Sequence, residues 1–193
     1  EFNPEYYDLK WLDPNNNTVK LQYIVNDQTK RDQFVITDPG VGLGGKRLEG
    51  FFSLGYSSKR LNSGELGGFG LGAKSPLATG VESYRMLTRY NGKEYCFDIY
   101  SHKVDCVYGK WGDNGTMNSF TEFETVKVSE KFVNELGETE IRQVPYKAYY
   151  KDTKEKNGTS LFIEVKKHNR AKYFEAVKSQ LMYLPADITF EEV

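Results

Sequence analysis

A glycine-rich stretch at residues 67–75 has the composition that points most directly to ligand chemistry. Its residues are Gly67, Gly68, Phe69, Gly70, Leu71, Gly72, Ala73, Lys74 and Ser75. Glycine costs backbone entropy in a folded chain, so a cluster of glycines indicates that something comes close to the main chain. Free backbone amides followed by the start of a helix form a site for phosphate. We therefore predict a phosphate-binding turn here, with a solvated flexible loop as the alternative.

A second candidate site follows a predicted buried strand at residues 33–37. The strand ends at Asp38, and Gly40 and Gly42 come shortly after it. A carboxylate at the end of such a strand is a hydrogen-bond acceptor for the floor of a pocket, and glycine lets a flat ligand lie against the backbone. Asp-Pro-Gly is also a strong turn signal. The residues alone favour neither the site nor the turn.

The elements that would position these residues are mostly strands. Alternating apolar residues predict a strand at 18–25. A nearly continuous apolar run predicts a central strand at 33–37, and the short connection makes the two an antiparallel hairpin. Asn91-Gly92 predicts a two-residue hairpin between 84–90 and 94–100. Further strands are predicted at 104–108, 119–128, 141–150 and 160–165.

Helices complete the expected fold. They are predicted at 46–53, 73–79 and 170–184, where Pro185 ends the last one. The segment 55–66 is small, polar and basic, which is typical of a lid over a site. Phe52, Tyr56 and Phe69 are interpreted as core residues instead of ligand contacts.

Composition limits the classes of function. A chain of 193 residues with 15% aromatic residues suits one globular domain. A net charge of −1 argues against a dedicated nucleic-acid surface. Cys96 and Cys106 are too few for a disulfide framework and show no zinc spacing, so we expect both to be buried and reduced in neighbouring strands. With no long apolar run and no signal peptide, the sequence predicts a cytoplasmic protein.

Three phosphate-binding designs compete for the glycine stretch. A dinucleotide fingerprint is excluded, because it must follow an apolar strand and residues 59–67 are polar. A P-loop would place Ala73 where that motif has glycine, before Lys74 and Ser75, and it also needs a buried strand in front. It stays open as a phosphotransferase alternative.

The third design depends on the order of several motifs. Asp38-x-Gly40-x-Gly42, then Gly68 to Ser75, then Gly158-Thr159 before a strand resemble the three glycine boxes of the GHKL superfamily. This superfamily of ATP-binding domains includes gyrase, the ninety-kilodalton heat-shock chaperone, histidine kinases and MutL. The resemblance covers roughly residues 18–167. Within the superfamily, residues 52–59 and 68–77 look most like the phage rapid-lysis (rII A-type) proteins.

The resemblance implies an α+β fold, a two-layer α/β sandwich with a mixed, mainly antiparallel sheet and helices on one face (the Bergerat fold). ATP would lie between helices and sheet under the lid. Asp38 would accept a hydrogen bond from the adenine amino group, Gly42 would let the ring approach, and Thr159 would support Asp38 directly or through a water. The amides of the glycine stretch would hold the phosphates, and Ser58, Lys59 and Lys74 would stabilise their charge.

One feature of the superfamily is missing from the sequence. Its members carry a helix before the first strand with a Glu that orients water and an Asn that binds Mg²⁺, and Glu1 to Pro4 do not match it. We expect that helix upstream of residue 1, and a following helical transducer segment to begin at 168–193. The intact protein would then bind ATP or ADP with Mg²⁺, hydrolyse ATP, close its lid and form a homodimer, while this chain alone would not hydrolyse efficiently. Membrane association would follow only from the phage resemblance. A non-catalytic GHKL-like interaction module is the alternative.

Overall fold

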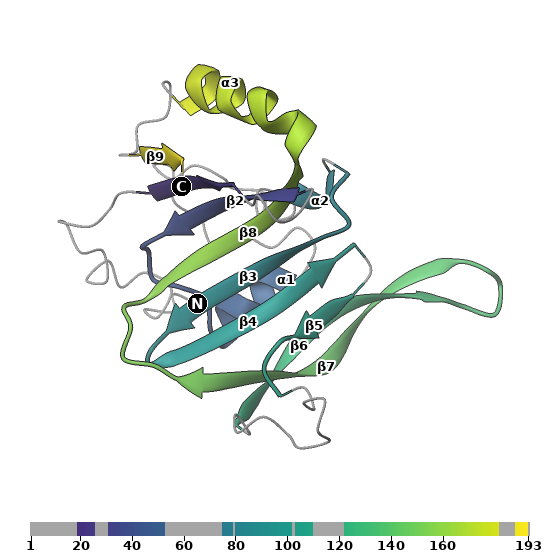
Figure 1. The fold of residues 1–193 in the computed structure, drawn as a ribbon. Helices are drawn as coiled ribbons and strands as arrows, with labels where there is room; N and C mark the ends of the chain where they lie inside the picture. Colours follow the sequence, from purple (N-terminus) through teal and green to yellow (C-terminus); the bar gives the residue numbers. More distant parts are fainter. Residues whose placement is uncertain are drawn as a thin grey trace, which may run out of the picture.

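The described part of the chain forms one mainly antiparallel sheet with helices. The computed structural model describes residues 19–25, 31–52, 75–78, 80–101, 103–109, 122–181 and 188–192. The strands run in the order β6-β7-β4-β3-β8-β2-β1-β9, with β5 beside β4 (Figure 1). Among the described strand pairs, β1 with β9 is parallel and the others are antiparallel. The prediction of a mixed, mainly antiparallel sheet in an α+β fold is confirmed.

The elements have the following bounds. The strands are β1 (Val19–Ile24), β2 (Arg31–Asp38), β3 (Ser83–Tyr90), β4 (Lys93–Tyr100), β5 (Val104–Cys106), β6 (Phe123–Val133), β7 (Thr139–Asp152), β8 (Gly158–Lys166) and β9 (Ile188–Glu192). The helices of the described residues are α1 (Lys46–Phe52), α2 (Ser75–Ala78) and α3 (Arg170–Leu181), the last preceded by a 3-10 turn at Lys167–Asn169.

Both predicted hairpins are present. β1 pairs antiparallel with β2, which lies inside the sheet between β1 and β8. β3 pairs with β4 across Asn91 and Gly92, whose φ angles of 49° and 77° are both positive. Positive φ at both turn residues matches the right-handed twist of the flanking strands, and asparagine and glycine tolerate it.

β8 joins the two hairpins into one sheet. It pairs with β2 on one side and with β3 on the other, so it fills the space between strands that come much earlier in the chain. Figure 1 shows β8 running between β2 and β3. The start of β8 therefore lies beside the end of β2.

Alternate residues of the central strands build the core. Tyr23, Met86 and Phe97 are completely buried. α1 adds Leu48 and Phe52 to the same hydrophobic cluster.

α3 packs through aromatic rings on the β1–β2 end of this core. The ring of Phe174 lies 5.2 Å from that of Tyr23, and the ring of Tyr173 lies 5.3 Å from that of Phe34, between centroids. Residues 173, 174 and 177 of the predicted helix thus face the sheet, as expected from their spacing.

The structure also departs from the sequence-based expectations. The helix predicted at 73–79 is described only as the short α2, and the proposed lid lies outside the described residues. Residues 188–192, expected within a helical segment, instead form β9 in register with β1. Short-range periodicity did not reveal this strand, because its pairing partner is at the other end of the chain.

The two cysteines agree with the prediction. Cys96 in β4 and Cys106 in the neighbouring strand β5 are both buried and free. Burial raises the pKa of the Cys96 thiol to about 11, which keeps it protonated and unreactive. No helix in the described ranges is both long enough and apolar enough to span a bilayer.

Candidate functional site

The site begins where β2 ends beside the start of β8. Asp38 and Thr159 are direct partners across these strands, and Thr159 is in turn the partner of Thr88 in β3. Directly paired residues of antiparallel strands point to the same face of a sheet. The register therefore places a carboxylate and two hydroxyl side chains in one row, on the face that carries the buried residues Phe34, Met86 and Ile163.

Thr88 is the centre of this row. It is completely buried, and its hydroxyl accepts a hydrogen bond from the amide of Leu43 at 2.7 Å. The same oxygen lies 3.0 Å from the hydroxyl oxygen of Thr159 and 3.3 Å from the carbonyl oxygen of Gly158. One side chain thus ties the loop after β2 to the start of β8.

Glycines allow the loop and the strands to approach this closely. Gly42 has a φ of +76°, and a Cβ there would lie 1.8 Å from the carbonyl oxygen of Arg89. A Cβ on Gly158 would lie 2.8 Å from the carbonyl oxygen of Asp38. Both positions are therefore explained by backbone packing in the protein itself, whether or not a ligand binds.

Asp38 forms the turn that its sequence suggested and keeps one oxygen available. The amide of Gly40 donates to Oδ1 of Asp38 at 2.8 Å. The side chain is exposed, and Oδ2 has no hydrogen-bond partner within the described residues. The turn and the site are therefore compatible: the turn fixes the carboxylate at the end of the strand, and its second oxygen can accept a hydrogen bond.

The far end of the loop is anchored by Glu124 of β6. Its Oε1 accepts hydrogen bonds from the amide of Gly45 at 3.1 Å and from the hydroxyl of Tyr95 at 2.6 Å. Burial and this bond to Glu124 raise the pKa of Tyr95, so that its hydroxyl stays a donor. α1 starts at the next residue, Lys46. The loop 39–45 is consequently held at both ends.

α1 also covers the outer edge of the sheet. Oε1 of Glu49 accepts the amide hydrogen of Lys127, a backbone group of the edge strand β6, at 3.1 Å. This contact and the one at Glu124 fix α1 against β6.

The structure brings together some of the predicted site residues and does not describe others. Asp38, Gly40, Gly42 and Thr159 converge at the corner formed by β2, β3 and β8. Thr159 bonds to Thr88, not to Asp38, through its hydroxyl. Of Ser75, the structure describes the backbone at the start of α2. The remaining predicted residues lie outside the described part of the chain: Ser58, Lys59, Gly67, Gly68, Phe69, Gly70, Leu71, Gly72, Ala73 and Lys74.

Sequence reasoning missed Thr88. A signal was present, because Thr88 continues the alternation of Tyr84 and Met86 in a predicted strand, at a position that should face the core. A polar residue at a core-facing position needs a hydrogen-bond partner, and such a residue at a strand end is a candidate for a site.

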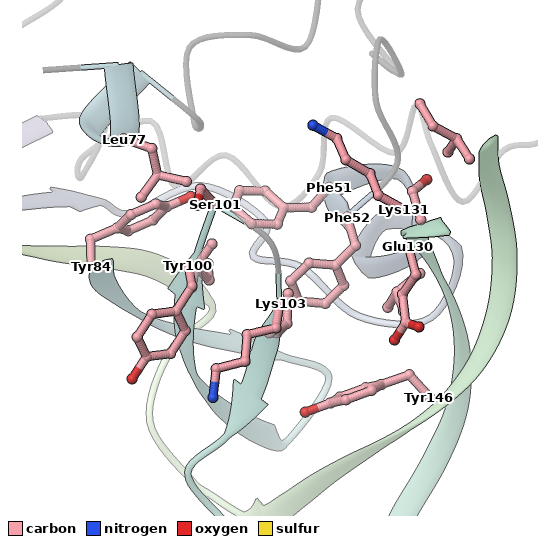
Figure 2. Close-up of a pocket in the computed structure, with 15 residues that line it drawn as sticks. Phe51, Phe52, Leu77, Tyr84, Tyr100, Ser101, Lys103, Glu130, Lys131 and Tyr146 are labelled. Atoms are coloured by element: carbon pink, nitrogen blue, oxygen red, sulfur yellow. The ribbon is translucent and has the colours of Figure 1, made fainter. Parts of the chain in front are cut away.

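A separate cavity of about 430 Å³ lies elsewhere on the same face of the sheet. Figure 2 shows Phe51 and Phe52 of α1, Leu77 of α2 and Tyr84 of β3 around it. Asp38, Gly42 and Thr159 are not among its described lining residues. The cavity and the Asp38 corner are therefore two different features.

The chemistry available at the Asp38 corner is recognition. An exposed carboxylate oxygen beside two hydroxyls can accept a hydrogen bond from the edge of a planar ligand. Within the described ranges, no group of three or more His, Cys, Asp or Glu side chains could hold a metal ion. No protein-family model matches the chain, and no curated protein matches its sequence. What the corner binds must follow from its own geometry.

Proposed function

We propose that the chain is an ATP-binding domain of the GHKL type and that Asp38 recognises the adenine ring. One observation carries the proposal. The first and third glycine motifs, at 38–42 and 158–159, are far apart in the sequence and yet adjoin across β2 and β8. Their order and spacing in the sequence predict a shared site independently of the strand pairing.

The chemistry of the corner supports a preference for adenine. The exocyclic amine of adenine would donate to Oδ2 of Asp38. Guanine has a carbonyl oxygen at the corresponding position, which would face the carboxylate as a second acceptor and leave both unpaired. A site that leaves buried or partly buried polar groups unpaired rejects the wrong ligand strongly.

The other parts of the proposal come from the motif resemblance. The domain would be a two-layer sandwich of the Bergerat type, which the packing of α1 and α3 against core residues of one sheet supports. The amides of residues 67–75 would hold the phosphates, with Ser58, Lys59 and Lys74 nearby. ATP and Mg²⁺ would close the 55–66 segment and favour a homodimer. This chain alone would not hydrolyse ATP efficiently.

The P-loop alternative is not favoured. That design places its loop after a strand of a parallel sheet. In the described sheet, the strands around the site, β2, β8, β3 and β4, all pair antiparallel.

Calorimetric titration with ATP, ADP and GTP tests the proposal. The parent chain should bind ATP and ADP and should bind GTP at least about tenfold more weakly. Asp38→Asn should weaken ATP binding by about tenfold or more, since an amide presents a donor where the amine needs an acceptor. Gly70→Ala should also weaken it.

A matched control isolates the carboxylate. Asp152→Asn changes an exposed acid of β7 away from the corner and should bind ATP as the parent does. If Asp38→Asn and Gly70→Ala bind ATP as tightly as the parent, the site assignment is wrong. Size-exclusion chromatography with light scattering measures the molar mass with and without ATP and Mg²⁺. A mass that doubles with ATP and Mg²⁺ supports the homodimer.

A further inference from the structure

The cavity beside α1 and α2 has the size and lining of a ligand site. Its volume of about 430 Å³ lies within the usual range of small-molecule pockets, about 300–1,000 Å³. Protein interiors are otherwise close-packed. Its lining comes from α1, α2 and the strands β3 to β7, so many separate elements shape one space.

Apolar and aromatic side chains form most of its walls. They are Phe51, Phe52, Leu77, Tyr84, Ile99, Val104, Val128 and Ile141. Ile141 is 52% exposed at this site, although it is a large apolar residue. Covering such surface with an apolar ligand is favourable, because it removes apolar area from water. Aromatic walls favour a flat aromatic ligand, since rings pack in offset or edge-to-face arrangements.

A fixed hydroxyl donor lies on the wall. The amide of Cys106 donates to the hydroxyl oxygen of Tyr146 at 2.7 Å, which holds the ring in place. Burial raises the pKa of Tyr146, so the hydroxyl keeps its proton and can donate it. Figure 2 shows Tyr146 on the lower side of the cavity.

The charged residues of the lining indicate which charge a ligand would carry. Lys103 and Lys131 contribute cations, and Glu130 is the acid among the described lining residues. The amine of Lys103 pairs with Asp105 at 2.9 Å. The amine of Lys131 is exposed and has no partner within the described residues. Lys131 is therefore the cation available to a ligand.

We propose that this cavity binds a small aromatic molecule that carries one anionic group. The ring packs against Phe51, Val104 and Ile141, the lining side chains that keep exposed apolar surface, and the anionic group lies near Lys131. The site is separate from the Asp38 corner, and the inference does not depend on nucleotide binding.

The probe for the test is 1-anilinonaphthalene-8-sulfonate, which is aromatic and carries one sulfonate. Its fluorescence should rise on titration with the folded 193-residue chain and saturate at one molecule per chain. Val104→Trp puts an indole into the cavity and should weaken binding by at least about tenfold. Val133→Trp makes the same change at a position 72% exposed outside the lining and should leave binding unchanged.

A second pair of variants tests the charge without disturbing the core. Lys131→Met should weaken sulfonate binding about two- to fivefold, the size expected of an exposed ion pair. Lys127→Met removes an exposed lysine of the same strand that does not line the cavity, and binding should stay the same. N-phenyl-1-naphthylamine is the same molecule as the probe without its sulfonate. It should bind the Lys131→Met variant and the original chain with equal affinity.

The proposal is overturned by any of three results. These are no saturable binding to the folded chain, equal binding by Val104→Trp, and equal loss in Val104→Trp and Val133→Trp. Near-ultraviolet circular dichroism and thermal unfolding of each variant establish that it is folded, because loosely packed states also bind this dye. If Val104→Trp does not fold, the Lys131→Met and Lys127→Met pair decides by itself: equal affinity of the two overturns the anionic site.

Discussion

Thr88→Val replaces the buried hydroxyl that joins the loop after β2 to β8. Valine has nearly the same shape, so no cavity forms and the change removes hydrogen bonds alone. The hydroxyl has contacts to the Leu43 amide at 2.7 Å, the Thr159 hydroxyl at 3.0 Å and the Gly158 carbonyl at 3.3 Å. Valine can replace none of them.

The expected magnitude follows from the burial of these groups. Thr88 is 0% exposed, so water does not take the place of its hydroxyl. Leaving the part-buried amide of Leu43 without an acceptor costs about 1–3 kcal/mol. We expect Thr88→Val to lower the free energy of unfolding by about 2 kcal/mol. In a chain of this length, 1 kcal/mol shifts the melting temperature by about 2–4 °C, so the shift is about 4–8 °C.

Denaturant unfolding of a small set of variants is the assay. Thr88→Ser keeps the hydroxyl and loses one buried methyl group, which costs about 1 kcal/mol. Thr125→Val changes an exposed threonine of β6 and should stay within about 0.5 kcal/mol of the parent. Thr159→Val combined with Thr88→Val should show a coupling energy of about 0.5–1.5 kcal/mol, because the two hydroxyls contact each other.

The reasoning fails if Thr88→Ser is as destabilising as Thr88→Val, since the methyl group would then matter and the hydroxyl would not. Strictly additive effects of Thr88→Val and Thr159→Val would also refute the contact. If ATP binds as proposed, Thr88→Val should weaken its binding more than Thr88→Ser does, measured at a temperature where both are folded.

Two further predictions concern stability. Gly42→Ala should lower the melting temperature far more than Gly137→Ala does. Both glycines have φ near +77°, so the backbone strain is similar. A Cβ at Gly42 would clash with the backbone of Arg89, whereas a Cβ at Gly137 would meet nothing within 4 Å. Equal losses would contradict the packing argument. Glu94 is buried, and although burial opposes it, hydrogen bonds from Lys151, Tyr108 and Arg89 lower the pKa of its carboxyl. Because the pKa of this carboxyl is lower in the folded chain than in the unfolded chain, its ionised form stabilises the fold at any pH above the unfolded pKa. That stabilisation is lost as the pH falls through the folded pKa. Glu94→Gln should therefore cost about 1–3 kcal/mol at pH 7, and its difference from the parent should shrink in acid below the unfolded pKa of about 4.3. A difference independent of pH would contradict this.

The local elements were predictable because their signals are local. Asn91-Gly92 specifies its hairpin, and alternation located most of β1 to β8. β9 was not predicted, because it forms by pairing with β1, where Ile188 is the partner of Val19. The sequence of 188–192 alone does not specify that pairing.

The candidate site was predictable only in part. Asp38, Gly42 and Thr159 were identified from motif order, and the structure brings them together. Thr88 and the cavity depend on which strands become neighbours, and one-dimensional periodicity does not contain that information. Gly42 was predicted to let the adenine ring approach, and the structure adds a reason within the protein: a Cβ there would lie 1.8 Å from the carbonyl oxygen of Arg89.

The position of β8 has a consequence for the order of events during synthesis. Its two neighbours, β2 and β3, leave the ribosome long before residues 158–166 do, and they do not pair with each other. Until β8 arrives, the two early hairpins each expose an open edge. Long-range pairing of this kind is slow and leaves strand edges vulnerable to aggregation. The pairing of β8 closes both edges and completes the Asp38 corner at the same time, so a nascent chain cannot recognise a ligand there before β8 has joined the sheet.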